Sequence, residues 1–158
     1  MKNLRLRARD QRGFNLIELM IVIAIIGLLI GVGSIAWQAV IRSGNETSAA
    51  TMLDRFRTYQ AQYAARNRGN FATFDKLVAS GGLDAQFAGD APVVNGYIFT
   101  MEITDQSPSA PASYKIWAEP QVATGVTATG TRFFLTSSSI SSIKAKEGQR
   151  ATETDNSI

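Results

Sequence analysis

The stretch RGFNLIELMIVIAIIGLLIGVGSIAW, residues 12–37, decides the fold of this chain. From residue 19 to residue 37 the only polar side chain is Ser34. A helix rises about 1.5 Å per residue and the hydrocarbon core of a bilayer is roughly 30 Å thick, so this run is long enough to cross a membrane. We therefore expect residues 14–37 to form a transmembrane helix.

Glu18 is the one charged residue between Arg12 and Arg42. A carboxylate among hydrocarbon is costly unless it is neutralised, moved to the interface or paired. If the chain is cut after Gly13, Phe14 becomes the new N-terminus and carries an α-amine. The amine of one copy is then available to pair with Glu18 of the next copy, which would set the register between two apolar helices.

Residues 12–19, RGFNLIEL, followed by the apolar run, resemble the class III leader of type IV pilins and pseudopilins. The resemblance covers roughly residues 1–40. It implies that a prepilin peptidase cuts between Gly13 and Phe14 on the cytoplasmic side and methylates the Phe14 amine. Asn15 stands where the family more often has Thr, and residues 33–36 (GSIA) stand where many members have a proline. The missing proline leaves open whether the helix kinks or melts on assembly.

Charge orients the predicted helix. The whole chain has a net charge of +3, but five basic side chains and Asp10 give residues 1–13 a charge of +4, which leaves −1 for the rest. Positive residues beside a span stay in the cytoplasm. We expect a single-pass inner-membrane protein with a periplasmic head before assembly, and an extracellular or periplasmic filament afterwards. The charge of the mature chain gives no support to nucleic-acid binding, despite a loose cluster of Arg55, Arg57, Arg66 and Arg68.

Two other interpretations of the apolar run are open. A conventional secretory signal cut near Ser34-Ile35-Ala36 would need an apolar region well beyond the usual ~7–15 residues, with Glu18 inside it. An uncleaved signal anchor, carrying an extracytoplasmic binding domain that does not assemble, would leave Glu18 without a role.

The chain contains no Cys and no His, which excludes a thiol nucleophile, a Ser-His-Asp triad and most zinc sites. A serine hydrolase would need the Ser137-Ser138-Ser139 run with Lys144 or Lys146, and a serine-rich loop explains that run more simply. We expect no enzyme activity, no metal and no cofactor. The disulfide that closes a C-terminal loop in many pilins is impossible here.

Gly27 and Gly31 have the spacing that lets two helices approach closely in lipid, although glycine is also simply tolerated in membrane helices. Beyond the span, Met52, Phe56, Tyr59 and Tyr63 mark one face of a helix that continues to residue 66. Ala49, Leu53 and Ala64 widen that face. We expect Gly69 to end that helix in the left-handed conformation.

The remaining head, within residues 38–143, reads as a short helix and a sheet. Residues 73–80 (TFDKLVAS) are typical of a short helix, and alternating apolar residues predict strands at 97–103, 114–119 and 131–136, with residues 139–143 extending or adding to them. Connections without helical pattern favour an antiparallel meander. Residues 144–158 are polar and read as a loosely held tail.

The expected fold is therefore α+β and pilin-like: a long N-terminal helix, its first half transmembrane, packed on a small antiparallel sheet. The expected function is that of a structural subunit of a type IV pilus or related filament. A pseudopilin of a type II secretion system is the alternative. The expected partners are further copies of the chain in a helical filament, the prepilin peptidase, the inner membrane, and a pilus or secretion assembly machinery.

Overall fold

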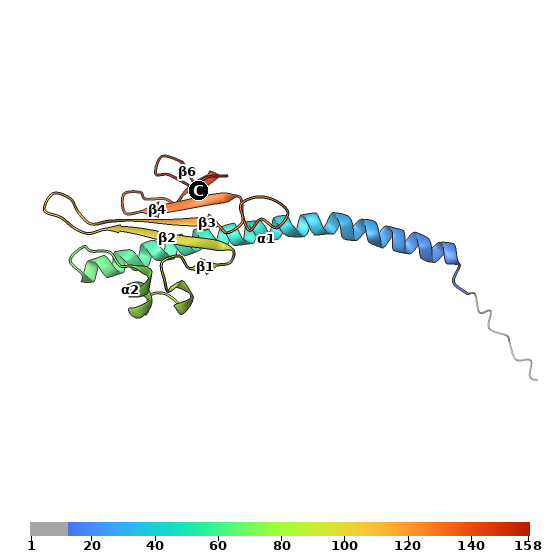
Figure 1. Ribbon diagram of the computed structural model, residues 1–158, viewed down its shortest axis with the longest axis horizontal. Coiled ribbons are helices and arrows are strands. Elements are labelled where there is room, and N and C mark those ends of the chain that lie inside the picture. Colours follow the sequence, from blue (N-terminus) through green and yellow to red (C-terminus); the bar gives the residue numbers. More distant parts are fainter. Residues whose placement is uncertain (1–12) are drawn as a thin grey trace, which may run out of the picture. The chain divides into compact units, whose positions relative to one another are not determined.

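The computed structural model describes residues 13–158, with the backbone alone for residues 34 and 35. Residues 1–12 of the predicted leader, residues 1–13, and the side chains of Ser34 and Ile35 therefore lie outside the described part. The chain divides into a unit that ends at Ala36 and a head, Trp37–Ile158. Helix α1, Leu16–Arg66, contributes to both (Figure 1).

Helix α1 ends where the sequence predicts. Arg68 and Gly69 both adopt left-handed backbone conformations, with φ of 55° and 84°. The Gly69 amide donates to the Ala64 carbonyl at 2.9 Å, which satisfies one of the carbonyls left over at the end of the helix. The short helix α2, Phe74–Ala79, also confirms its prediction: the Thr73 hydroxyl accepts from the Lys76 amide at its N-terminus. A single 3-10 turn, η1, follows at Ala85–Phe87.

The sheet is a six-stranded antiparallel meander in the order β1-β2-β3-β4-β5-β6. The long strands β2 and β3 pair over their full length. The strands are β1 Val93–Val94, β2 Tyr97–Thr104, β3 Ser113–Pro120, β4 Arg132–Ser137, β5 Lys144–Glu147 and β6 Asn156–Ser157. The β1–β2 turn is Asn95-Gly96, both at positive φ, the pattern that tight hairpins favour. The α+β class and the meander predicted from the sequence are confirmed.

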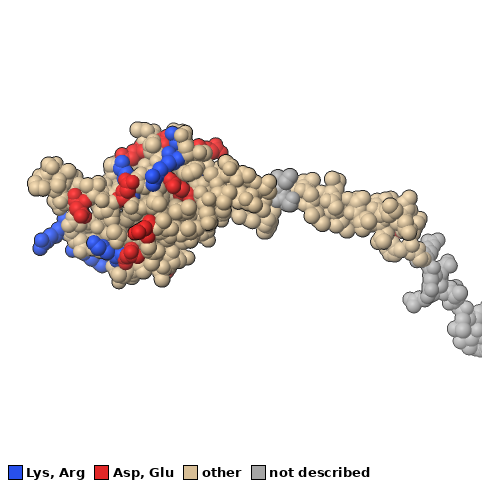
Figure 2. All heavy atoms as spheres, viewed as in Figure 1, with Lys and Arg blue, Asp and Glu red and all other residues tan. Residues whose placement is uncertain are grey.

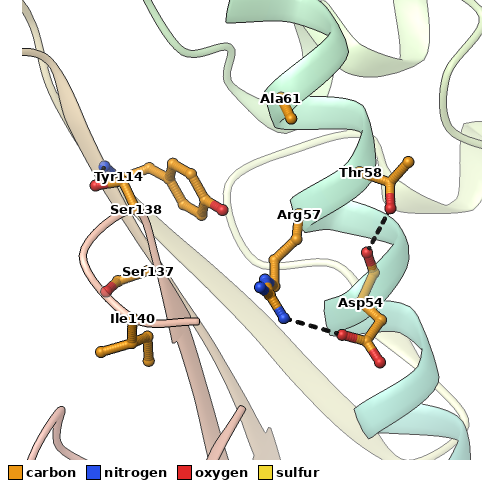
Figure 3. Close-up of a pocket in the computed structure, with 8 residues that line it drawn as sticks. All are labelled: Asp54, Arg57, Thr58, Ala61, Tyr114, Ser137, Ser138 and Ile140. Carbon is orange, nitrogen blue, oxygen red and sulfur yellow. Dashed lines mark hydrogen bonds and ion pairs between the residues drawn. The ribbon is translucent and has the colours of Figure 1, made fainter. Parts of the chain in front are cut away.

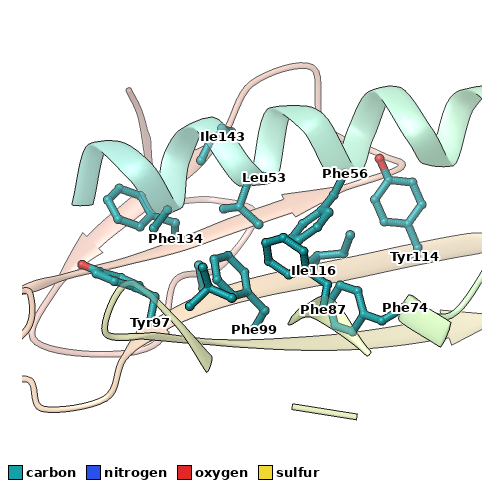
Figure 4. Packing of buried hydrophobic residues seen from close by; sticks show 13 residues of the cluster. Leu53, Phe56, Phe74, Phe87, Tyr97, Phe99, Tyr114, Ile116, Phe134 and Ile143 are labelled. Atoms are coloured by element: carbon teal, nitrogen blue, oxygen red, sulfur yellow. The ribbon is translucent and has the colours of Figure 1, made fainter. Parts of the chain in front are cut away.

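One face of the sheet packs on α1, and the core lies between them (Figure 4). Phe56 is fully buried and its ring contacts those of Phe74, Phe87 and Phe99, with centroids 5.2–5.5 Å apart. Truncating such a residue to alanine costs about 3–5 kcal/mol. The helix is thus held to the sheet by an aromatic cluster.

The buried face of α1 contains Ala49, Leu53 and Phe56 of the predicted face, but it is centred to one side of the predicted aromatic residues. Met52, Tyr59 and Tyr63 are only half-buried, at the margin of the interface. The buried line repeats at spacings of three and four and has a polar residue at each end: Glu46, Ala49, Leu53, Phe56 and Gln60. The two polar residues are accommodated because each has hydrogen-bond partners: the backbone of Ala72 for Gln60, and Thr131 with Arg132 for Glu46.

The C-terminal segment differs from the loosely held tail expected from its composition. Residues 139–143 lie outside the strands, and β5 begins at Lys144. On the face of the sheet away from α1, the buried Trp117 donates through its ring N–H to the Ala151 carbonyl at 3.1 Å. The Arg150 guanidinium lies 4.1 Å from the centroid of that ring and contacts Glu119 at 2.9 Å. These contacts hold the segment without a disulfide.

Candidate functional site

The first turn of α1 is built by Asn15. Its side-chain oxygen accepts from the Ile17 amide at 3.2 Å, and its carbonyl accepts from Glu18 and Leu19 at 3.0 and 3.2 Å. This is the hydrogen bonding of an N-cap, a position that Asn fills at least as well as Thr. The departure from the commoner Thr therefore preserves the start of the helix.

Glu18 is the third residue of α1 and the acidic group of its first turn. Its side chain is exposed. A negative charge here interacts favourably with the N-terminal end of the helix dipole, typically by about 0.3–1 kcal/mol. The position also leaves the carboxylate open to a cation from outside the chain.

The predicted cleavage point lies just before this turn. Gly13 and Phe14 precede the helix, and Phe14 is 82% exposed. A peptide bond in exposed, non-helical chain is accessible to a protease, because no secondary structure must open first. Cleavage there and methylation of Phe14 stay predictions.

The apolar part of α1 has no cover within the described chain. From Leu16 to Val32 its large apolar side chains are 43–74% exposed. Among the described residues, α1 is the one helix long and apolar enough to span a membrane. So large an apolar surface requires either lipid or other protein around it.

Gly27 and Gly31 lie in this exposed region. They line a shallow apolar hollow on the helix surface together with Leu28, Val32 and Ala36. A Cβ atom built on either glycine meets nothing within 4 Å. The hollow gives a neighbouring helix room to approach, as the predicted packing role needs, but it does not identify that neighbour.

A buried carboxylate, which the sequence did not reveal, joins α1 to the start of strand β4 within the head. Glu46 is 7% exposed and accepts from the Thr131 amide at 2.9 Å, the Thr131 hydroxyl at 3.1 Å and Arg132 Nε at 2.7 Å. Burial raises its pKa, but the hydrogen bonds from Thr131 and the adjacent Arg132 charge outweigh burial, and the pKa of Glu46 lies below its ordinary value. Glu46 is therefore ionised at neutral pH and acts as a structural tie. In the sequence, the burial of Glu46 was indicated by its position alone, three residues before Ala49 and seven before Leu53 on the same face of α1.

The residues that a serine hydrolase would need make other contacts. The Ser137 and Ser139 hydroxyls both donate to Glu153, at 2.9 and 2.8 Å. Lys144 donates to the Ser157 hydroxyl, and Lys146 pairs with Asp155 at 3.3 Å. Within the described residues, neither lysine forms a hydrogen bond with a serine of this run.

Ser137 and Ser138 also border an open hollow of about 480 Å³ between α1 and the sheet, lined on the helix side by Asp54 and Arg57 (Figure 3). Arg57 pairs with Asp54 at 3.3 Å and donates to the Ser141 carbonyl at 2.7 Å. Burial raises the pKa of Tyr114, which also lines the hollow, and the Arg57 charge opposes that rise. The polar groups here are engaged with one another, and we assign this hollow no chemistry.

The arginine side chains considered for nucleic-acid binding do not form a single basic surface. Arg42 donates to backbone carbonyls of the β3–β4 loop, and Arg57 is engaged as described. Arg66 and Arg68 line a separate hollow with Lys76 and Asp105. In the described part of the chain, no group of three or more Asp or Glu side chains is placed to hold a metal ion.

Comparison with known families locates the motif. Residues 8–34 match the family model described as the prokaryotic N-terminal methylation motif. This segment is the class III signal peptide of type IV pilins, and the resemblance inferred from residues 12–19 is confirmed. The match supports a place for the chain among type IV pilin-like proteins, which include the pseudopilins. Comparisons with curated proteins and with solved structures returned no match.

Proposed function

We propose that this chain is a structural subunit of a type IV pilus or related filament. In this proposal prepilin peptidase cuts between Gly13 and Phe14, methylates the new amine, and frees the chain to assemble through its N-terminal helix. The observation that carries the proposal is the methylation motif at residues 8–34, combined with Glu18 as the one acid at the start of an uncovered apolar helix.

The register between subunits follows from the charges. When apolar helices leave the bilayer and pack on one another, contacts with protein replace contacts with lipid, and both are apolar. Such contacts favour no particular axial offset between neighbouring helices. The Phe14 amine and Glu18 of a neighbouring subunit are the two charges that must meet, since any other stagger leaves each unpaired among apolar side chains. Gly27 and Gly31 then permit a close approach of the helix backbones.

The location of the chain follows from the same features. Before assembly the helix spans the inner membrane once, with its N-terminus in the cytoplasm and its head in the periplasm. After assembly the subunits form a filament in the periplasm or outside the cell, built by a pilus or secretion machinery. The role is structural rather than catalytic.

The test is filament assembly by variants of Glu18. Glu18→Ala and Glu18→Gln should insert into the membrane as the unmodified protein does, but lower filament yield more than about tenfold, because an unpaired buried amine costs well above the ~1.4 kcal/mol that equals a factor of ten. Asn15→Thr is the matched control: it replaces one N-cap with another in the same turn and should assemble normally. Normal filament yield from both Glu18 variants would refute the proposal.

A further inference from the structure

The head carries exposed apolar side chains on the part of α1 that first enters it and on the loop between β3 and β4. Val126, on that loop, is 77% exposed, and Trp37, on α1, is 65% exposed. We call the set the apolar foot; it consists of Trp37, Val40, Ile41, Val122 and Val126. Residues 121–131 contain no charged residue, and neither does α1 from residue 19 to residue 41. Figure 2 shows the charges on this face of the head gathered away from the end where α1 leaves it.

Hydrogen bonds tie the base of the loop to the rest of the head. At its base the Gln121 amide donates to the Gly96 carbonyl at 2.8 Å, and the Thr129 amide donates to the Val122 carbonyl at 2.8 Å. Asn45 on α1 donates to the Thr129 carbonyl at 2.9 Å. The tip that carries Val126 is therefore presented on a closed, fixed base.

Arg42 satisfies the carbonyls of the loop tip. Its Nη2 donates to Gly125 at 2.7 Å and to Val126 at 3.1 Å, and its Nε donates to Ala128 at 3.1 Å. In water such carbonyls need no protein donor, because water serves them equally well. Near hydrocarbon an unsatisfied carbonyl is costly. An arginine that covers three of them while one valine points outward is suited to a loop that leaves water.

We propose that the apolar foot lies in the headgroup region of the membrane while the chain awaits assembly. The partner is a lipid surface, and the argument for lipid is continuity: the foot follows directly along α1 from the uncharged stretch that is proposed to span the bilayer. Trp is enriched at the membrane–water interface, and an arginine beside it can keep its charge among anionic headgroups. This inference rests on the membrane anchoring in the proposed function.

The chain lacks cysteine, so a single substitution gives a unique labelling site in the full-length protein. Val126→Cys, labelled with an environment-sensitive fluorophore, is reconstituted in vesicles of phosphatidylcholine and phosphatidylglycerol. The Val126 side chain is exposed and its backbone makes the Arg42 contact, so the label leaves the loop intact. Ser109→Cys, exposed in the β2–β3 connection, is the matched control, and Leu29→Cys reports on the span.

The readout is quenching by lipids that carry a nitroxide near the headgroup or near the chain end. A foot seated about 5–10 Å into the interface should lose about twofold more fluorescence at position 126 than at position 109 with the shallow quencher, while position 29 responds to the deep one. Adding Arg42→Gln should bring position 126 toward the control and leave position 29 unchanged. An unaltered response would overturn the role of Arg42.

The other outcomes separate this inference from membrane anchoring. If position 29 is quenched while position 126 behaves like position 109, the foot is refuted and anchoring stands. If position 29 is not quenched, anchoring itself fails and the foot fails with it. If position 126 shifts its emission without lipid quenching and in proportion to protein density, the foot contacts a second copy, which also overturns the proposal.

Discussion

Replacing the buried acid on α1 should measurably loosen the head. In Glu46→Gln the side chain keeps its size and one oxygen that can still accept from Thr131. The new amide nitrogen, however, takes the place of the oxygen that accepts from Arg132 Nε at 2.7 Å, so two donors face each other. The variant therefore loses the charge-assisted contact while leaving the packing around it unchanged.

The magnitude follows from what each group can do afterwards. A hydrogen bond to a charged group contributes about 1.5–3 kcal/mol net. The Arg132 side chain is 44% exposed and can form hydrogen bonds with water, so the loss of its contact with Glu46 adds little further cost in stability. We expect Glu46→Gln to lower the free energy of unfolding by about 2 kcal/mol, and Glu46→Ala by about 3 kcal/mol, because alanine also leaves the Thr131 amide without its acceptor.

The effect should depend on pH in a defined direction. The folded-state pKa of Glu46 lies below its ordinary value of 4.5. Its contribution is therefore complete above pH 4.5 and is lost as the pH falls through the lower folded-state pKa. The difference between the unmodified protein and the Glu46→Gln variant should accordingly shrink on acidification.

The assay is urea unfolding of the full chain in a mild detergent, followed by near-ultraviolet circular dichroism at neutral and at acidic pH. Asp54→Asn is the matched control, since Asp54 is also an acid on α1 paired with an arginine, but its side chain is 66% exposed. That change should cost less than about 0.5 kcal/mol. If Glu46→Gln costs no more than Asp54→Asn, Glu46 is not the tie that we describe.

Three further predictions concern the head. Gln60→Leu leaves the buried amide and carbonyl of Ala72 without their partners at 2.9 and 2.6 Å, so it should cost about 2–4 kcal/mol and speed hydrogen exchange at the Ala72 amide. In Gly130→Ala the new methyl group overlaps the Tyr97 hydroxyl, and the urea midpoint should fall by an amount equivalent to about 1–3 kcal/mol. Hydrogen bonds from the Ser139 and Ser137 hydroxyls hold the pKa of Glu153 below its ordinary value. The contacts by which Glu153 holds residues 148–158 on the sheet should therefore weaken as the pH falls through that lowered pKa. Limited proteolysis of this segment should accelerate in acid, and should accelerate less in Glu153→Gln.

The sequence was sufficient for the elements whose signals are local. The apolar run predicted the long helix, Gly69 marked its end, residues 73–80 predicted the short helix, and the alternation around Tyr97 and Phe99 placed a strand. Each of these depends on residues within a few positions of one another, and each agrees with the structure.

The buried face of α1 could not be placed in the same way. The aromatic residues Tyr59 and Tyr63 indicated one line, while the line that is buried includes Glu46 and Gln60. A polar residue can be buried at low cost only if it has hydrogen-bond partners. The partners of Glu46 are Thr131 and Arg132, which lie 85 and 86 positions after it in the chain. The C-terminal strands were missed because Lys144 and Lys146 of β5 find their partners at Ser157 and Asp155, outside the local pattern, and because the backbone of β5 pairs with β4 and β6.

The sequence alone named Gly13, Phe14, Glu18, Gly27 and Gly31 as candidate site residues, and their roles in processing, assembly and helix packing stay predictions. The structure adds that Asn15 caps the helix, that Phe14 and Glu18 are exposed, and that the two glycines border an open apolar hollow. The proposed pairing between Phe14 and Glu18 would join two copies of the chain, so it is tested by assembly rather than by the fold of one chain.

The most direct test of the account is mass spectrometry of the N-terminus of the protein isolated from its native cell. The account predicts a mature chain that begins at Phe14 and carries one methyl group on its amine, since that amine is the cation proposed to meet Glu18 of the next subunit. A native chain that retains residues 1–13, or that begins beyond residue 36, would contradict it.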